Sequence, residues 1–293
     1  MTGPRHPQNY RKTLQREARH WSRGDPLQTA WFQKEPGRVT RYVNQLLTGD
    51  HYKPWFRLIE DRGPFRRACS LGSGASLIEG ELIRHGAVAT WELYDLSSRA
   101  LRRARWSMRR HWRRVSTHVA DVNRLTLARD SYDLILCNSC LHHFVELERI
   151  LDEIAKALTD DGLLAVYDFV GETRLQWSEV HIAFQQALLE TVPQEFRISP
   201  DARIEPPEVS TLSPFEAIRS AEIPALLQER FRPEFWKTLG GALFPLALYL
   251  GAGDLERARP DVVDEIIKKD RELSENPSPH FPNPVLCALL RRR

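Results

Sequence analysis

Two glycines followed at a distance by an acid are the first sign of ligand binding in the sequence. The turn Gly72-Ser73-Gly74 ends a short apolar run, and Ser76 with Glu79 three residues on reads as the capping box that begins a helix. Two glycines let a ligand approach the backbone closely, and the first turn of a helix offers unpaired N–H groups. Asp95 ends another apolar run about twenty residues further on, where nucleotide-binding folds place an acid on the ribose hydroxyls. The pattern therefore indicates a site for a nucleoside-containing ligand.

Short apolar runs and helical patterns alternate along the chain, and these elements must position the turn and the acid. We expect strands at 68–71, 91–96, just before Asp121, and at 132–138, 163–169, 231–239 and 284–290. We expect helices at 38–58, 97–114, 141–158, 176–191, 221–229 and 260–273, with an apolar helix up to Leu250. The alternation is typical of an α/β fold.

Residues 65–170 resemble the class I S-adenosylmethionine (SAM) dependent methyltransferases. The resemblance rests on the ordered series of the glycine turn, Asp95, Asp121, the fourth strand with the histidines after it, and the fifth strand. It implies a Rossmann-like sheet of seven strands, mostly parallel with the last strand antiparallel, and helices on both faces. It also implies SAM as cofactor and S-adenosylhomocysteine as product.

The resemblance assigns the cofactor residues. The glycine turn would pass the methionine part of SAM, Asp95 would bind the ribose, and Asp121 would flank the adenine. The full set implied is Ser70, Gly72, Ser73, Gly74, Asp95, Leu96, Asp121, Val122 and Asn138. Two positions depart from the family pattern, because Ser70 stands where an acid is usual and Ser76 stands near the place of a third glycine.

Two histidines follow the fourth strand. The pattern Leu141-His142-His143-Phe144, with Asp168 near the end of the fifth strand, resembles small-molecule O-methyltransferases, including those that methylate sugars on natural products. In those enzymes a histidine and this aspartate act on the acceptor hydroxyl. An alcohol must lose its proton as it attacks, imidazole can take that proton, and a carboxylate can orient the ring. The sequence does not choose between His142 and His143.

Additions flank and interrupt the expected methyltransferase domain, which we place at 65–293. Residues 1–64 are basic and rich in tryptophan, and we expect them to be either a helical lid over the cleft or packing on the sheet edge, with the part up to about Arg23 partly mobile. Insertions are expected at about 171–214 and 240–280. Arg174, Trp177 and His181 are candidates to bind the substrate, and the apolar second insertion could complete the pocket or make a homodimer contact.

The expected helix 97–114 is rich in arginine, and its apolar stripe Ala100, Ala104, Met108 and Trp112 should pack on the sheet. The arginines could bind RNA phosphates, but a solvated or oligomer-contacting face is the more common role of such a helix. A non-methylating enzyme and a non-catalytic protein on the same fold also stay open. We expect a small-molecule acceptor and no nucleic acid.

Composition and cysteine spacing bear on whether the protein spans a membrane, forms disulfides or binds a metal. The 293 residues carry a net charge of +3 and 42% hydrophobic residues, which is typical of a soluble globular protein and gives no sign of a membrane span. Four cysteines without a paired spacing pattern fit a reducing cytoplasm. Cys137-Asn138-Ser139-Cys140 is a CxxC motif, but no second ligand pair completes a zinc site, so we expect no metal.

Overall fold

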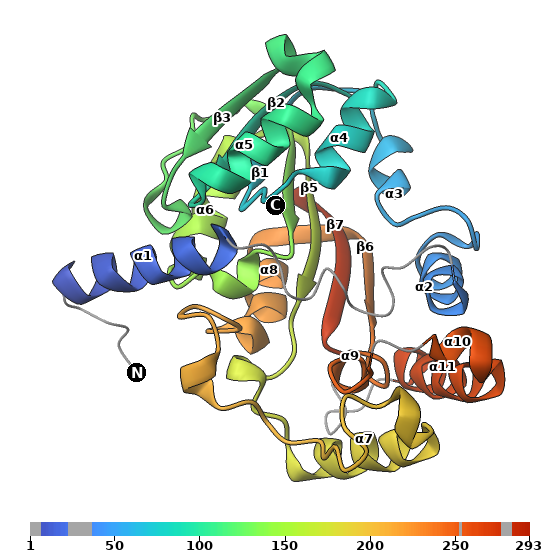
Figure 1. Ribbon diagram of the computed structural model, residues 1–293. Coiled ribbons are helices and arrows are strands. Elements are labelled where there is room, and N and C mark those ends of the chain that lie inside the picture. The colour runs from blue at the N-terminus through green and yellow to red at the C-terminus, as the bar shows by residue number, and fades with distance from the viewer. Residues whose placement is uncertain (1–6, 23–36, 252–253, 277–282) are drawn as a thin grey trace.

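A single seven-stranded sheet organises the computed structural model, which describes residues 7–22, 37–251, 254–276 and 283–293 (Figure 1). The strand order is β3-β2-β1-β4-β5-β7-β6. Strands β1 to β5 pair in parallel, and β7 runs antiparallel to both β5 and β6. The strands are β1 (Phe65–Leu71), β2 (Val88–Asp95), β3 (Val115–Val119), β4 (Tyr132–Asn138), β5 (Leu158–Phe169), β6 (Phe231–Leu239) and β7 (Val285–Arg292). The predicted Rossmann-like sheet is confirmed.

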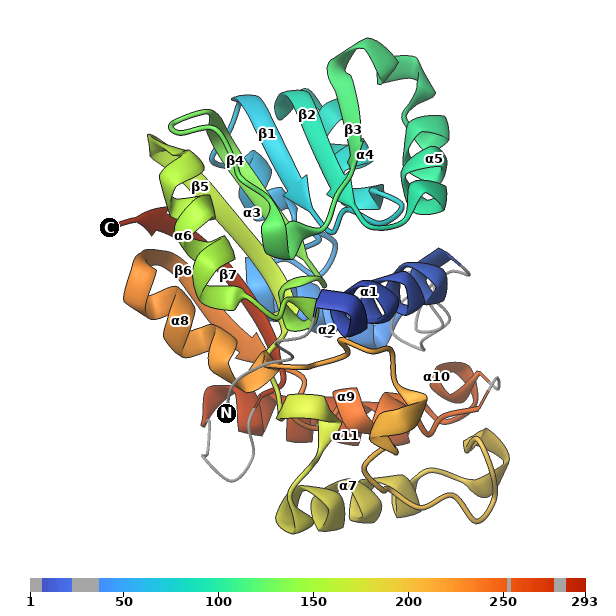
Figure 2. The same cartoon turned by 90° about the vertical axis from the view of Figure 1, so that its left-hand side faces the viewer.

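Helices cover both faces of the sheet (Figures 1 and 2). The α-helices are α1 (Pro7–Ser22), α2 (Arg38–Thr48), α3 (Arg57–Glu60), α4 (Leu77–Arg84), α5 (Ser98–Ser107), α6 (Leu147–Ala157), α7 (Glu179–Thr191), α8 (Ile223–Arg230), α9 (Phe244–Ala247), α10 (Leu255–Ala258) and α11 (Pro260–Glu275). Side chains of α3, α4 and α5 pack on one face, and those of α6 and α8 pack on the other. None of these described helices is long and apolar enough to cross a membrane.

The central strands are buried on both faces, as the continuous apolar runs predicted. In β4, Ile135 and Cys137 join the core under α6, while Leu134 and Leu136 join the core under α4 and α5. Cys137 is fully buried and acts as a small apolar residue. All four cysteines are buried and free of disulfides.

A third core lies beyond the carboxyl end of β5 and joins the two expected insertions (Figure 1). It contains residues of α7, α9 and α11 together with Val39 and Tyr42 of α2. The buried carboxylate of Asp270 accepts hydrogen bonds from Tyr42 Oη and from the N–H groups of Gly240, Ala242 and Leu243. Helix α2 is therefore tied into this core through Val39 and Tyr42, and its Leu47 joins the core beside the sheet.

The part up to about Arg23 was expected to be partly mobile, and within it residues 7–22 form helix α1, whose polar side chains meet partners distant in sequence. Two sequence expectations need correction. The helix expected over 97–114 ends at Ser107 and continues as a 3-10 helix, so Trp112 leaves the apolar stripe and is 60% exposed. The apolar helix expected up to Leu250 is the single turn α9.

Candidate active site

The glycine turn has the backbone form that its residues predicted. Gly72 and Gly74 have φ values of +61° and +53°, the left-handed region that favours glycine. A Cβ on Gly72 would lie 2.6 Å from Cys140 Cβ, whereas a Cβ on Gly74 would meet nothing within 4 Å. Gly72 therefore lets the turn pack against the segment that carries the histidines, and Gly74 borders open space.

Asp95 holds this turn from the end of β2. Its Oδ2 accepts a hydrogen bond from Gly74 N at 2.9 Å, and its Oδ1 accepts one from Ser97 N at 2.6 Å. Burial raises the pKa of Asp95 above its ordinary value, and these backbone hydrogen bonds oppose that shift. Each oxygen has a second lone pair that could accept from a ribose hydroxyl. Ser73 Oγ is buried without a partner among the described residues. The open space at Gly74, the lone pairs of Asp95 and the orphaned Ser73 hydroxyl fit a bound nucleoside.

Ser70 and Glu79 form a buried pair beneath the turn, and this overturns the expected capping box. Ser76 has a φ of 55° and makes no capping hydrogen bond. Glu79 instead turns inward, where its Oε1 accepts a hydrogen bond from Ser70 Oγ at 2.5 Å. Burial raises the pKa of Glu79 to about 7, although Ser70 opposes the shift. A carboxyl group thus lies beside Ser70, the position where the resembled family usually has an acid.

The residues expected to flank the adenine lie under the amino-terminal helix. Asp121 begins a 3-10 turn at Val122–Arg124 and accepts a hydrogen bond from Asn123 N. Its other oxygen accepts one from Tyr10 Oη of α1 at 2.8 Å. Val122 is buried, and Leu96 and Asn138 are half-buried at the ends of their strands. Helix α1 therefore lies over the predicted cofactor residues, between the sheet and the third core (Figure 2).

Asp168 and His142 form the most tightly bonded pair of the site. His142 Nδ1 donates to Asp168 Oδ1 at 2.5 Å, and Asp168 Oδ2 accepts from the N–H groups of Cys140 and Leu141 at 2.7 Å each. These bonds hold residues 141–143 in a 3-10 turn, so the helix expected from 141 begins only at Leu147. Burial acts to lower the pKa of His142, but the charge of Asp168, its hydrogen bond and Glu216 outweigh burial and raise it.

Two glutamates that no sequence pattern indicated complete the cluster. Glu216 Oε1 lies 3.5 Å from His142 Nε2, and Glu216 Oε2 lies 3.9 Å from His143 Nε2. Glu17 Oε1, from α1, lies 3.2 Å from His143 Nδ1. Both histidines therefore have a carboxylate at Nδ1 and face Glu216 with Nε2. Three possible ligand atoms, one each from His142, His143 and Glu216, lie within 4.8 Å of one another. This spacing could also hold a metal ion.

Arg174 supports the segment that carries Glu216. Its side chain donates to the carbonyl oxygens of Pro214 and Glu216 at 2.9 and 3.1 Å, and its N–H donates to Ala217 O. Arg174 and Ala217 have φ values of 59° and 45°, which are strained for residues other than glycine. Ile218 N also donates to the carbonyl oxygen of His142. Strained backbone thus holds Glu216 against the histidine turn.

The other two residues expected to bind substrate lie in the third core. Trp177 is 6% exposed and packs among apolar residues there. His181 is 1% exposed, and its Nδ1 lies 2.9 Å from Glu172 Oε1. Both side chains are enclosed by packing: Trp177 lies just before α7 and joins this core, and His181 lies on the buried face of α7.

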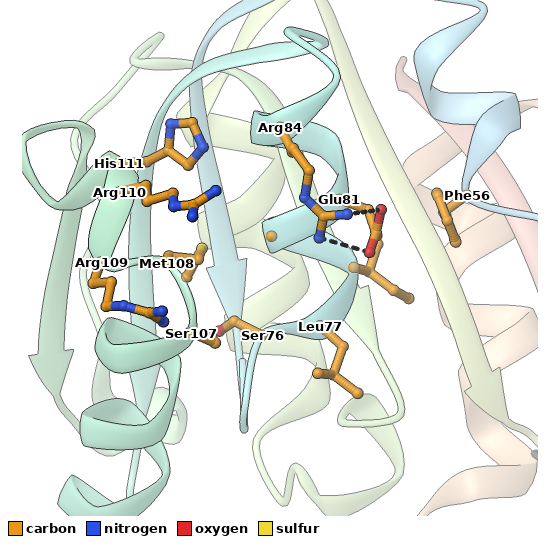
Figure 3. A pocket seen from close by; sticks show the side chains of 12 residues that line it. Phe56, Ser76, Leu77, Glu81, Arg84, Ser107, Met108, Arg109, Arg110 and His111 are labelled. Carbon is orange, nitrogen blue, oxygen red and sulfur yellow. Dashed lines mark hydrogen bonds and ion pairs between the residues drawn. The ribbon is translucent and has the colours of Figure 1, made fainter.

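A hollow of about 720 Å³ lies elsewhere, between α4 and α5 (Figure 3). Leu77, Arg84, Arg109, Arg110 and His111 line it, and Arg84 pairs with Glu81 at its wall. Its lining contains none of the residues that the sequence assigned to cofactor or catalysis. The hollow is therefore separate from the site that the sequence predicted.

Residues 69–166 match the family model described as a methyltransferase domain. Together with the sheet order and the glycine turn, the match shows that this part of the chain, about a third of it, is a methyltransferase domain of the class I, SAM-dependent kind. SAM is the cofactor of this class.

Similar proteins add the following. A malonyl-[acyl-carrier protein] O-methyltransferase from Bacillus cereus is 33% identical over 79 residues, which are 27% of this chain and 28% of that protein. A SAM-dependent methyltransferase from Mesorhizobium loti is 18% identical, with a TM-score of 0.48, over 81% of this chain and 97% of that one. The N-methyltransferase NodS from Bradyrhizobium japonicum in complex with S-adenosyl-L-homocysteine is 15% identical, with a TM-score of 0.48, over 96% and 98% of the two chains. At these values the structural likenesses carry no information on the acceptor.

Proposed function

We propose that this protein transfers a methyl group from SAM to a hydroxyl group of a small molecule, such as a natural product or a sugar. The observation that carries the proposal is the His142–Asp168 pair, whose Nε2 faces Glu216. The open space at Gly74, in the same strand-end region, supports the cofactor assignment. We further propose that the protein works in the cytoplasm, where SAM is made, and that a homodimer is compatible with its apolar second insertion.

Bound SAM supplies an electrophilic methyl group on a sulfonium. The protein's task is then to remove the proton of the acceptor hydroxyl. Asp168 holds the Nδ1 proton of His142, so neutral His142 has its lone pair on Nε2 and can accept that proton there. Asp168 then stabilises the imidazolium that forms. We choose His142 over His143 as the base because only His142 has a short, buried hydrogen bond from Nδ1 to a carboxylate.

Glu216 and His143 are proposed to position the acceptor. Glu216 lies between the two Nε2 atoms, so its oxygens can accept from hydroxyl groups of a substrate placed there. Arg174 acts indirectly in this proposal, because its hydrogen bonds fix the backbone of Glu216. Alignment of the acceptor oxygen in a site closed to water supplies much of the remaining acceleration.

The proposal is tested by transfer of labelled methyl from SAM to a panel of hydroxylated natural products and sugars. Calorimetric titration with S-adenosylhomocysteine, on the wild type and on Asp95→Asn, measures the cofactor site separately. We expect methylation of some acceptors, and binding that weakens markedly in the variant. If the wild type binds S-adenosylhomocysteine but methylates none of the panel, a small-molecule hydroxyl acceptor is not supported.

An RNA acceptor is the second candidate, since α5 and the 3-10 helix after it carry arginines and two exposed tryptophans. Trp106 and Trp112 are 70% and 60% exposed, and the guanidinium groups of Arg109 and Arg113 lie over their rings. Aromatic rings among cations are suited to stacking bases beside phosphates. Filter binding of tRNA across a salt series tests this candidate, because binding through phosphates should weaken steeply with salt.

A further inference from the structure

Helix α1 carries a buried carboxylate into the catalytic cluster. Glu17 is 1% exposed. Its oxygens accept hydrogen bonds from Trp21 Nε1 at 2.8 Å, from Ser213 Oγ at 3.2 Å and from Phe215 N at 3.1 Å. Burial acts to raise the pKa of Glu17, but His143, Trp21 and the Phe215 N–H outweigh it and hold the pKa below its ordinary value. Burial of a charged carboxylate has a desolvation cost. We therefore looked for a function of Glu17 at this position.

The fixed carboxylate faces one ring nitrogen of His143. Glu17 Oε1 lies 3.2 Å from Nδ1, and the edge of Trp21 packs on the same ring at 5.0 Å between centroids. An ionised carboxylate only accepts hydrogen bonds, so the nearer one favours the proton: Glu17 at 3.2 Å favours it on Nδ1 over Nε2, where the Glu216 oxygen is 3.9 Å away. Nε2 is then the ring atom that faces Glu216, as it is in His142. Glu17 thus lies at Nδ1 of His143 as Asp168 lies at Nδ1 of His142, but at 3.2 Å rather than 2.5 Å and without an aligned hydrogen bond.

On either side of Glu17, the same helix contacts one predicted cofactor residue, Asp121, and Ser97, whose N–H donates to the predicted cofactor residue Asp95. Tyr10 Oη donates to Asp121 Oδ2 at 2.8 Å, and the hydroxyls of Ser22 and Ser97 lie 2.9 Å apart. Glu17 lies between these two contacts in the sequence of α1. The helix that covers the cofactor residues is therefore also the one that supplies the partner of His143.

We propose that Glu17 is a positioning residue of the acceptor site, which fixes the proton of His143 on Nδ1 and so directs Nε2 toward the acceptor. The inference rests on the proposed function, because that function makes His143 and Glu216 position the acceptor. It makes the amino-terminal helix a part of the acceptor site as well as its cover.

The test compares Glu17→Gln with Glu172→Gln, a matched control that changes the carboxylate beside His181 in the same way. Two-dimensional ¹⁵N spectra of histidine-labelled protein, with S-adenosylhomocysteine bound, report which nitrogen of each ring holds the proton. The signals of His143 are assigned by their loss in His143→Asn. A glutamine can donate its amide proton to Nδ1, so we expect neutral His143 to move from the Nδ1–H to the Nε2–H form in Glu17→Gln only.

Turnover gives a second readout on an acceptor found in the labelled-methyl screen. We expect Glu17→Gln to lower kcat by up to about 100-fold, the cost of a misplacement of about 1 Å, with the Kd of S-adenosylhomocysteine unchanged. Glu17→Asp keeps the charge and should restore the wild-type nitrogen signals, which also covers the case in which the glutamine variant fails to fold.

Unchanged His143 signals in Glu17→Gln would overturn the inference. An unchanged kcat together with weakened S-adenosylhomocysteine binding would also overturn it, since Glu17 would then serve only to hold α1 over the cofactor residues. If the wild type methylates nothing, the proposed function fails, but the nitrogen spectra still decide whether Glu17 positions His143.

Discussion

At the scale of single residues, the proposed chemistry depends on transfer of the acceptor's hydroxyl proton to His142 Nε2. Replacing His142 with glutamine keeps a polar side chain of similar size but removes the base. We expect His142→Gln to lower kcat by about 10²- to 10⁴-fold, the range typical of general bases, with little change in S-adenosylhomocysteine affinity. Steady-state kinetics and calorimetry measure the two effects. If His143→Gln costs far more turnover than His142→Gln, the base has been assigned to the wrong ring.

The raised pKa of His142 predicts the pH dependence. The neutral ring is the base, so kcat/KM should rise with pH through a pKa above the ordinary value of about 6.5. Asp168→Asn removes the charge that raises this pKa while keeping a hydrogen-bond acceptor. The rising limb should therefore move to lower pH in the variant, with a smaller plateau. A limb that stays in place when Asp168 is changed would show that another group titrates.

Glu79 predicts a stability change of known sign. Its folded-state pKa of about 7 lies above the ordinary 4.5, so the folded protein binds this proton more tightly than the unfolded chain does. Its contribution to stability is full below about pH 4.5 and is lost as pH rises toward 7. Glu79→Gln should raise the free energy of unfolding by up to about 3 kcal/mol at pH 8 and by much less at pH 5.

Urea denaturation at both pH values measures this difference, and the exposed Glu275→Gln serves as control. An equal effect of Glu79→Gln at pH 5 and pH 8 would mean that the carboxyl group does not titrate in this range.

At the scale of elements, sequence patterns located the strands well. The bounds of β4 and β6 agree with the predicted runs. For β4 the reason is that a strand buried on both faces leaves a nearly continuous apolar stretch. Patterns failed where a distant residue decides local structure. Asp168 accepts hydrogen bonds from the N–H groups of Cys140 and Leu141, so α6 begins later than predicted. Glu79 accepts a hydrogen bond from Ser70 instead of capping the start of its helix. Local spacing carries no information about such partners.

Helix α1 provides the prediction at this scale. Its contacts with Asp121 and Ser97 lie beside the proposed cofactor site, so a bound nucleoside should favour the docked helix. We expect S-adenosylhomocysteine to slow amide hydrogen exchange within residues 9–22, measured by mass spectrometry. The glycine turn at 72–74 serves as the internal control. Protection of the turn without any change in α1 would show that the helix does not respond to the cofactor.

At the scale of the whole molecule, the site is assembled from segments far apart in sequence. The resemblance placed His142, His143 and Asp168 at adjacent strand ends, and the sheet brings His142 and Asp168 into contact. Glu17 and Glu216 could not be found in this way, because they come from an amino-terminal helix and a strained loop outside the repeating strand and helix pattern. Topology fixes which strand ends meet, but it does not fix which loops fold back over them.

The central claim is methyl transfer to a hydroxyl with a histidine as the base. The most direct measurement is the transfer of labelled methyl from SAM by the wild type in the presence of EDTA, with the product identified by NMR. We predict a methyl ether on a small hydroxylated acceptor, formed at the same rate with and without the chelator. A rate that requires an added divalent cation would instead place a metal among His142, His143 and Glu216, and label found only on nitrogen or RNA would contradict the claim.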